Sequence, residues 1–225
     1  MTLTACDSSE DEVFEPVRAT AEDVPADPAQ RDPTTGETIG TNNFTLYSLR
    51  TNEIVVSYDD AERADLASTR WDIGFNGTDI ILNGGSSGPG AALGVVVPEA
   101  FDDVEDALAN DFTYRRDGES PCPDVRGPRG TEAGVPRAVC DGTGNGWYTY
   151  VGFPSGRGGY VVPTAGRTLL VRLADGQGYA KVGFTSYYQG SPDPSTITDQ
   201  SQDRYYSFEF VTNPTGSSFE RDMEM

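Results

Sequence analysis

The clearest indication of the fold is the segment Trp71-Asp72-Ile73-Gly74-Phe75-Asn76-Gly77-Thr78-Asp79-Ile80-Ile81-Leu82. Trp71, Ile73 and Phe75 occupy alternate positions, which places three large apolar side chains on one face of a β-strand. The dipeptide Asn76-Gly77 tolerates positive φ in a tight turn, and a second apolar run follows it. The stretch therefore predicts a β-hairpin with one buried face.

Segments of the same kind recur along the chain. Each is short, rich in β-branched and aromatic residues, and bounded by turn-forming residues. We expect further strands at 44–49, 53–58, 93–97, 147–151, 160–162, 167–173, 179–188 and 205–211. One helix is expected from Pro98 to Asn110, because Phe101, Val104 and Leu108 lie three and four residues apart. The sequence predicts an all-β fold of predominantly antiparallel sheets, or a sandwich, with one short helix.

Composition divides the chain into a folded domain and flanking segments. Residues 1–6 are expected to be the remnant of a lipoprotein signal, and 7–40 a disordered acidic tether. The β domain should span 41–213, with 115–146 as a long loop insertion, and 214–225 should be a flexible tail. No apolar run is long enough to predict a transmembrane helix.

The motif Leu3-Thr4-Ala5-Cys6 matches the pattern that the bacterial lipoprotein signal peptidase reads. We expect Cys6 to carry the lipid, so that the membrane is a partner through this anchor. An export signal needs an apolar run of about 7–15 residues, and only Met1-Thr2 precede the motif. We therefore expect the true start codon to lie upstream. The alternative is a chance match at an ordinary N-terminus.

The formal net charge is −20, and Lys181 is the only lysine. Acidic chains depleted in lysine are typical of salt-adapted organisms, where concentrated salt screens the self-repulsion. An ordinary acidic exported protein is the alternative. In either case nucleic acid is not expected as a partner, because no basic patch offsets the phosphate charge.

The chain contains no histidine. This excludes Ser-His-Asp and Cys-His catalysis, and also zinc or haem held by histidine. Paired carboxylates remain available for hydrolase chemistry, but among 36 acidic residues the sequence singles out no pair. We expect no catalytic residues, no metal site and no enzyme activity.

Two cysteines besides Cys6 bracket a loop rich in Pro and Gly. In an oxidising compartment Cys122 and Cys140 are expected to pair, which would stabilise the fold by about 3 kcal/mol in the chain-entropy model. The alternative is two unpaired thiols.

The chain resembles the HmuY family of bacterial lipoproteins over roughly residues 43–212, apart from the 115–146 loop. The resemblance is carried by 71–79, by 83–88, by Gly146-Trp147, and by a series of later segments: 170–172, 175–176, 180–182, 185–187 and 205–210. It implies an antiparallel β fold with a short helix, attached by lipid to the outer membrane on its periplasmic or cell-surface face. It also implies haem or porphyrin as ligand and a TonB-type uptake receptor as partner.

The chain departs from the family at the haem ligands, which are pairs of histidines or methionines. The second ligand position falls at Gly152, and the first falls in the 115–146 insertion, which holds neither residue type. Met1, Met223 and Met225 are the only methionines. The resemblance therefore extends to the fold but not to the axial ligation.

Aromatic residues are the remaining candidates for ligand contact. Tyrosine ligates haem iron in some proteins, and the residues nearest the equivalent edge are Tyr114, Trp147, Tyr148, Tyr150 and Tyr160. Packed residues with a solvated hydroxyl are the alternative interpretation. Two functional hypotheses remain: a lipid-anchored binding protein that takes haem or a porphyrin with non-standard ligation, and a structural or docking lipoprotein that binds no haem.

Overall fold

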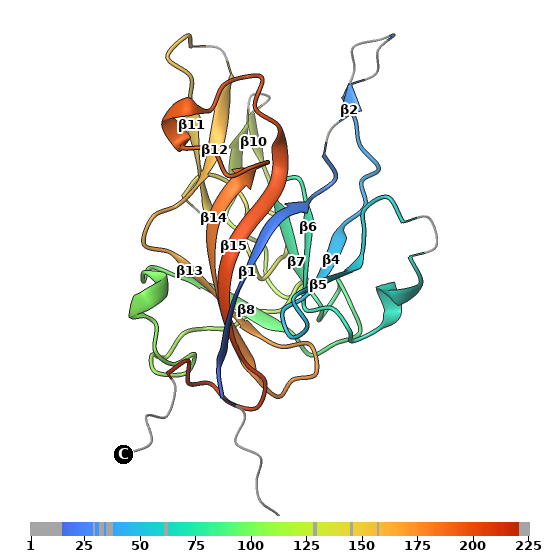
Figure 1. Ribbon diagram of the computed structural model, residues 1–225, viewed down its shortest axis with the longest axis vertical. Helices are drawn as coiled ribbons and strands as arrows, with labels where there is room; N and C mark the ends of the chain where they lie inside the picture. Colours follow the sequence, from blue (N-terminus) through green and yellow to red (C-terminus); the bar gives the residue numbers. More distant parts are fainter. Residues whose placement is uncertain are drawn as a thin grey trace, which may run out of the picture.

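Two antiparallel β-sheets face each other in the computed structural model of the protein (Figure 1). The structure describes residues 15–220 except 29, 32–33, 35–37, 61–62, 128–129, 145 and 157. Within this part of the chain the helices are short 3-10 turns: η1 (Ala64–Ala67), η2 (Phe101–Asp103) and η3 (Pro194–Thr196). The predicted all-β class is confirmed.

The larger sheet has five strands in the order β1-β15-β14-β13-β8. Their bounds are Val17–Pro25 for β1, Asp203–Asn213 for β15, Tyr179–Tyr188 for β14, Thr168–Arg172 for β13 and Leu93–Val97 for β8. All neighbours are antiparallel. Four of these strands coincide with predicted ones, and β1 does not.

The smaller sheet has four strands in the order β5-β4-β6-β7. They are β5 (Glu53–Val56), β4 (Thr45–Ser48), β6 (Ile73–Asn76) and β7 (Asp79–Leu82). The hairpin predicted from residues 71–82 is β6–β7, with Ile73 opposite Leu82 and Asn76 opposite Asp79. Gly77 begins its two-residue loop at φ 53°, a conformation that glycine adopts without steric cost.

Three further pairs of strands lie outside the two sheets. One pair, β11 (Tyr148–Gly152) and β12 (Gly159–Pro163), projects at the end of the domain that holds the last residues of β14 (Figure 1). The other two pairs are β2 (Gln30–Arg31) with β3 (Thr38–Ile39), and β9 (Val125–Gly127) with β10 (Gly130–Glu132).

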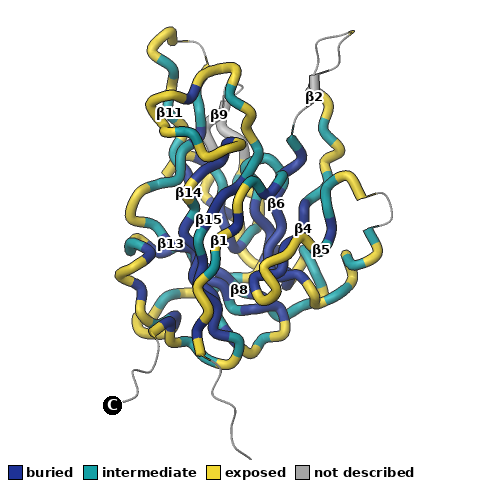
Figure 2. The backbone as a smooth tube through the Cα atoms, in the orientation of Figure 1, coloured by how far each residue is buried: buried dark blue, intermediate teal, exposed yellow. Residues whose placement is uncertain are grey.

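The main core lies between the two sheets, where the strands are buried (Figure 2). Phe75 of β6 packs on Tyr206 and Phe208 of β15, with ring centroids 4.5 and 5.6 Å apart. Each such aromatic side chain removes a large apolar area from water. Ile73 and Phe75 therefore face the larger sheet, as the alternation predicts. The prediction is wrong for Trp71, which precedes β6 and packs in a separate cluster with Leu46, Val56 and Ile81.

The prediction of a disordered tether over residues 7–40 is wrong for residues 17–25, which form β1. This strand pairs with β15 from Val17 opposite Thr212 to Pro25 opposite Tyr205. Ala21 and Val24 are buried, whereas Thr20 and Glu22 are exposed. The two buried side chains of the strand are small, so composition alone does not distinguish it from a tether. Residues 7–14 lie outside the described residues.

The helix predicted over 98–110 is wrong. Only η2 forms, and the backbone at Val104 is extended. Phe101 and Val104 are buried against the outer face of the larger sheet, but Leu108 is 56% exposed. The ammonium of Lys181 donates hydrogen bonds to the carbonyl oxygens of Phe101 and Val104 at 2.8 and 2.7 Å. In an α-helix these two carbonyl oxygens would instead accept backbone N–H groups.

The tail also differs from its prediction, because part of 214–225 is packed. Phe219 is buried in the cluster on the outer face of the larger sheet, and its N–H donates to the carbonyl of Glu105 at 2.7 Å. Ser218 forms a β-bridge with Asp106. Residues 221–225 lie outside the described residues. Among the described residues, no helix is long and apolar enough to span a bilayer.

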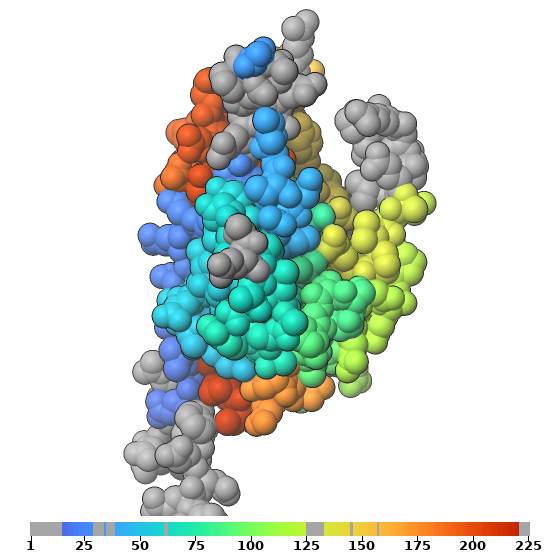
Figure 3. Space-filling model, turned by 90° about the vertical axis from the view of Figure 1, so that its right-hand side faces the viewer, coloured from blue at the N-terminus to red at the C-terminus, as the bar shows by residue number. Residues whose placement is uncertain are grey.

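The predicted 115–146 insertion runs along one flank of the domain, beside the segment around β8 (Figure 3). Arg115 forms a β-bridge with Gly94. The buried carboxylate of Asp117 accepts N–H groups of Leu82 at 2.9 Å and of Ala138 at 2.7 Å. Cys122 and Cys140 form a disulfide, with Cα atoms 5.4 Å apart. The insertion is therefore tied to the sheets at several points.

Candidate functional site

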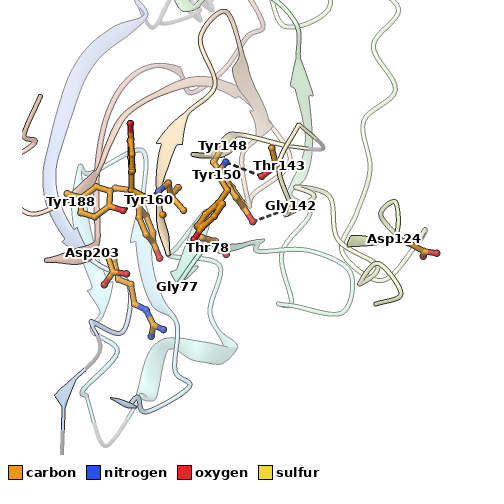
Figure 4. Close-up of a pocket in the computed structure, with 14 residues that line it drawn as sticks. Gly77, Thr78, Asp124, Gly142, Thr143, Tyr148, Tyr150, Tyr160, Tyr188 and Asp203 are labelled. Carbon is orange, nitrogen blue, oxygen red and sulfur yellow. Dashed lines mark hydrogen bonds between the residues drawn. The ribbon is translucent and has the colours of Figure 1, made fainter. Parts of the chain in front are cut away.

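A cavity of about 870 Å³ opens at the end of the domain that carries the β11–β12 hairpin. Its wall combines the hairpin, the ends of β14 and β15, the β6–β7 turn and the insertion (Figure 4). Five tyrosines contribute to the lining: Tyr148, Tyr150, Tyr160, Tyr187 and Tyr188. The cavity lies within the range of about 300–1,000 Å³ that is usual for small-molecule sites.

Backbone amides orient two of the tyrosine hydroxyls. The hydroxyl of Tyr148 accepts the N–H of Gly142 at 2.8 Å, and that of Tyr188 accepts the N–H of Val161 at 3.1 Å. A phenol has one hydrogen to donate besides its acceptor lone pairs. The hydroxyl of Tyr188 therefore keeps its own hydrogen for another acceptor, whereas that of Tyr148 also interacts with the side chain of Thr78.

Burial disfavours the phenolate form of three tyrosines in the cavity: Tyr148, Tyr187 and Tyr188. Burial raises the pKa of Tyr148, although the hydrogen bond from Gly142 opposes the shift. Burial likewise raises the pKa of Tyr187 and Tyr188. The cavity thus presents neutral hydroxyl donors rather than phenolates.

Charged groups lie at the edges of the cavity. Asp203 and Arg204 stand where β15 begins, and Asp124 lies across the opening on the insertion (Figure 4). Burial raises the pKa of Asp203, and neighbouring Arg204 opposes that shift. The Arg204 guanidinium donates to the carbonyl of Asp27 at 2.9 Å, so its orientation is set by the protein.

The structure brings together three of the five aromatic residues that the sequence indicated. Tyr148, Tyr150 and Tyr160 line the cavity. Trp147 lies behind the wall, buried against Tyr148 and Tyr187, and its indole N–H donates to the carbonyl of Thr78 at 3.1 Å. Tyr114 lies elsewhere: it packs on Tyr179 at the outer face of the larger sheet.

Tyr187 and Tyr188 are the lining residues that sequence reasoning missed. In a regular strand two adjacent residues point to opposite faces. The register of β14 against β15 shifts between Ser186 and Tyr188, and both tyrosines are buried at the cavity. The adjacent pair Tyr187-Tyr188 at the end of a predicted strand was the available signal.

The described residues that line the cavity include no histidine or methionine, the side chains that ligate haem iron strongly in many proteins. Gly152, the position aligned with one ligand, is exposed at the end of β11 and is not part of the lining. Within the described ranges, no three His, Cys, Asp or Glu side chains gather closely enough to hold a metal ion. The aromatic walls suit a flat ring, but the donor set does not suit two-fold axial ligation.

The protein is an antiparallel β domain with an aromatic cavity beside a projecting hairpin. This combination is typical of a binding protein rather than of a purely structural domain. The sequence model of one family, described as HmuY protein, matches residues 40–210. The chain therefore belongs to the HmuY family, a family of cell-envelope proteins of the haem-binding type. A search of curated proteins found no match.

Proposed function

We propose that the protein is a lipid-anchored envelope binding protein that holds a flat aromatic ligand of the haem or porphyrin class in the tyrosine cavity. Membership of the HmuY family supports the ligand class. The observation that carries the proposal is the cavity itself, about 870 Å³ in volume and lined by five tyrosines.

Stacking and hydrogen bonds are the contacts that this lining offers. Tyr160 and half-exposed Tyr150 belong to the projecting hairpin, so their rings are available to the face of a bound macrocycle. Tyr148 and Tyr188 offer hydroxyl donors to its polar edge. When bound, haem would supply an iron centre, and we expect no pair of strong protein ligands on it.

We further propose that Cys6 carries the lipid. The direction of β1 then determines which way the cavity faces relative to the membrane. Ten residues, 7–16, separate Cys6 from Val17, so the eleven steps between their Cα atoms reach at most about 40 Å. From Val17 the strand runs about 26 Å to Pro25, which pairs with Tyr205 next to the cavity residues Asp203 and Arg204. Figure 1 shows the start of β1 and the β11–β12 hairpin at opposite ends of the domain.

On this proposal the tether joins the domain at the end opposite the cavity. An anchored molecule would therefore expose the cavity away from its own membrane attachment, where a receptor of the TonB-dependent type could approach it. On this proposal the outer membrane is the site of attachment.

A haemin titration of the full-length protein, followed by visible absorption, tests the function. We expect saturable binding with a high-spin spectrum, because the cavity lacks two strong axial ligands. Sharp low-spin bands would contradict the proposed mode of binding. An unchanged haemin spectrum would favour the other hypothesis, a docking lipoprotein that binds no haem.

Matched tyrosine variants assign the binding to this cavity. Tyr188→Phe removes a hydroxyl that faces the cavity, and we expect about fivefold weaker haemin binding. Tyr114→Phe removes a buried hydroxyl at the outer face of the larger sheet and should leave haemin affinity unchanged. Equal affinities of both variants and the wild type would place the ligand elsewhere.

A further inference from the structure

Tyr187 is a buried residue at the cavity whose hydroxyl has no hydrogen-bond partner among the described residues. Its side chain is 4% exposed and lines the cavity. No hydrogen bond to this hydroxyl is formed by the residues that the structure describes. The hydroxyl therefore keeps its hydrogen for an acceptor that occupies the cavity.

The surroundings of Tyr187 hold its ring in one orientation. The ring packs edge-on against Tyr188 and Tyr206, with interplanar angles of 89° in both contacts. It also contacts the indole of Trp147, with centroids 5.8 Å apart. A ring confined by three aromatic neighbours presents its hydroxyl at a defined place, which is what a binding group needs.

Tyr206 shows what the same residue type does when its role is structural. It is fully buried behind the cavity, and its hydroxyl donates to the carbonyl of Gly77 at 2.9 Å. Tyr187 and Tyr206 are thus adjacent tyrosines, one with an internal acceptor and one without.

We propose that the hydroxyl of Tyr187 is a ligand-binding donor, and that together with the hydroxyls of Tyr148 and Tyr188 it recognises an oxygen or nitrogen acceptor on a flat aromatic ligand. Three neutral hydroxyl donors can recognise a ligand that carries a hydrogen-bond acceptor and an aromatic face. Such a ligand needs no metal. The inference rests on the proposed function, which it deepens. A metal-free tetrapyrrole should bind this cavity as well as its iron complex does.

Two probes test the independence from metal: protoporphyrin IX, which is metal-free, and haemin. Trp147 contacts Tyr187 and Tyr148 directly, so quenching of tryptophan fluorescence in the full-length protein reports occupation of the cavity. We expect dissociation constants within about threefold of each other. Haemin binding more than about tenfold tighter than protoporphyrin IX would overturn the inference but leave the proposed function standing. If neither probe binds, the proposed function itself fails.

Tyr187→Phe tests the residue, with Tyr206→Phe as its matched control. Loss of the Tyr187 hydroxyl should weaken binding of both probes about tenfold while leaving the urea midpoint unchanged or higher, since no internal hydrogen bond is lost. Tyr206→Phe should lower the urea midpoint, because the Gly77 carbonyl loses its donor. Unchanged affinity in folded Tyr187→Phe would mean that only water meets this hydroxyl, and would refute the proposal.

Discussion

The carboxylate of Asp117 accepts the backbone N–H of Ala138 at 2.7 Å, across the base of the insertion. Its second oxygen accepts the N–H of Leu82 at the end of β7. One buried side chain thus joins both ends of the insertion's main loop to the smaller sheet. Because this loop and the residues after it contribute Asp124, Gly142 and Thr143 to the cavity, the link also supports the site.

Replacing Asp117 should therefore destabilise the fold. Asp117→Ala leaves two buried N–H groups without an acceptor, and we expect the free energy of unfolding to fall by about 2–4 kcal/mol. Urea denaturation at neutral pH measures the change. Asp111→Asn, an exposed acidic position nearby, is the control and should change stability by less than about 0.5 kcal/mol. Similar losses in both variants would contradict the role given to Asp117.

The disulfide should stabilise the protein by closing the same loop. Cys122 and Cys140 are separated by 18 positions, and removing such a link is expected to cost about 3 kcal/mol. We expect a reducing agent to lower the thermal midpoint of the wild type but to leave the Cys122→Ala/Cys140→Ala double variant unaffected. A wild-type midpoint that does not respond to full reduction would count against this prediction.

The strands that sequence predicted well carry their signal in large apolar residues. Residues 71–82 show alternation and a turn dipeptide, and they form β6 and β7. The same holds for β14 and β15. By contrast, β1 contributes only Ala21 and Val24 to the core, and its stability depends on hydrogen bonds to β15 that composition cannot reveal. The helix predicted at 98–110 does not form, because two of its carbonyl oxygens accept hydrogen bonds from Lys181, which is distant in sequence.

The site was partly predictable for a similar reason. Tyr148, Tyr150 and Tyr160 belong to one hairpin, so proximity in sequence places them together. Tyr187 joins them only through the pairing of β14 with β15 and the irregular register at Ser186. Trp147 and Tyr114 show the opposite case: aromatic residues close in sequence to the site that pack behind it or on another face.

Alkaline pH should destabilise the fold through Tyr47. Burial, with a smaller effect of Glu53, raises the pKa of Tyr47 to about 12 from an ordinary value of 10.0. The folded state therefore holds this proton more tightly than the unfolded state does. Its contribution is fully present below pH 10 and is lost as the pH rises from about 10 to about 12.

Tyr47→Phe isolates this effect. In the wild type, the free energy of unfolding should decrease across this pH window, and in the variant the decrease should be shallower by about 1 kcal/mol per pH unit. Chemical denaturation at several pH values gives both slopes. At pH 7 the variant should differ only by the lost hydrogen bond to Asn52. Parallel slopes in the two proteins would show that Tyr47 does not carry the dependence.

Salt should stabilise the protein because its net charge is −20. Raising the salt concentration from about 0.1 M to 1 M shortens the screening length from about 10 to 3 Å and weakens the repulsion among acidic residues. We expect the thermal midpoint to rise steadily over this range, and equally in sodium and potassium chloride. A midpoint that is flat or falls with salt would argue for an ordinary acidic protein rather than a salt-adapted one.

Strand β1 gives the sharpest contrast between composition and structure, because an acidic tether and an edge strand respond differently to substitution. In the strand, Ala21 faces the core and Thr20 faces solvent. Ala21→Asp would place a charge in the core, and we expect it to lower the free energy of unfolding by about 3 kcal/mol or more. Thr20→Asp adds the same charge one residue away and should have little effect.

Deletion of residues 1–14 should leave the thermal midpoint unchanged, whereas deletion of residues 1–25 should lower it sharply by uncovering Phe208 and Phe210. Equal tolerance of Ala21→Asp and Thr20→Asp would mean that this segment is not held on β15, and the proposed attachment of the tether at the end of the domain opposite the cavity would then no longer follow.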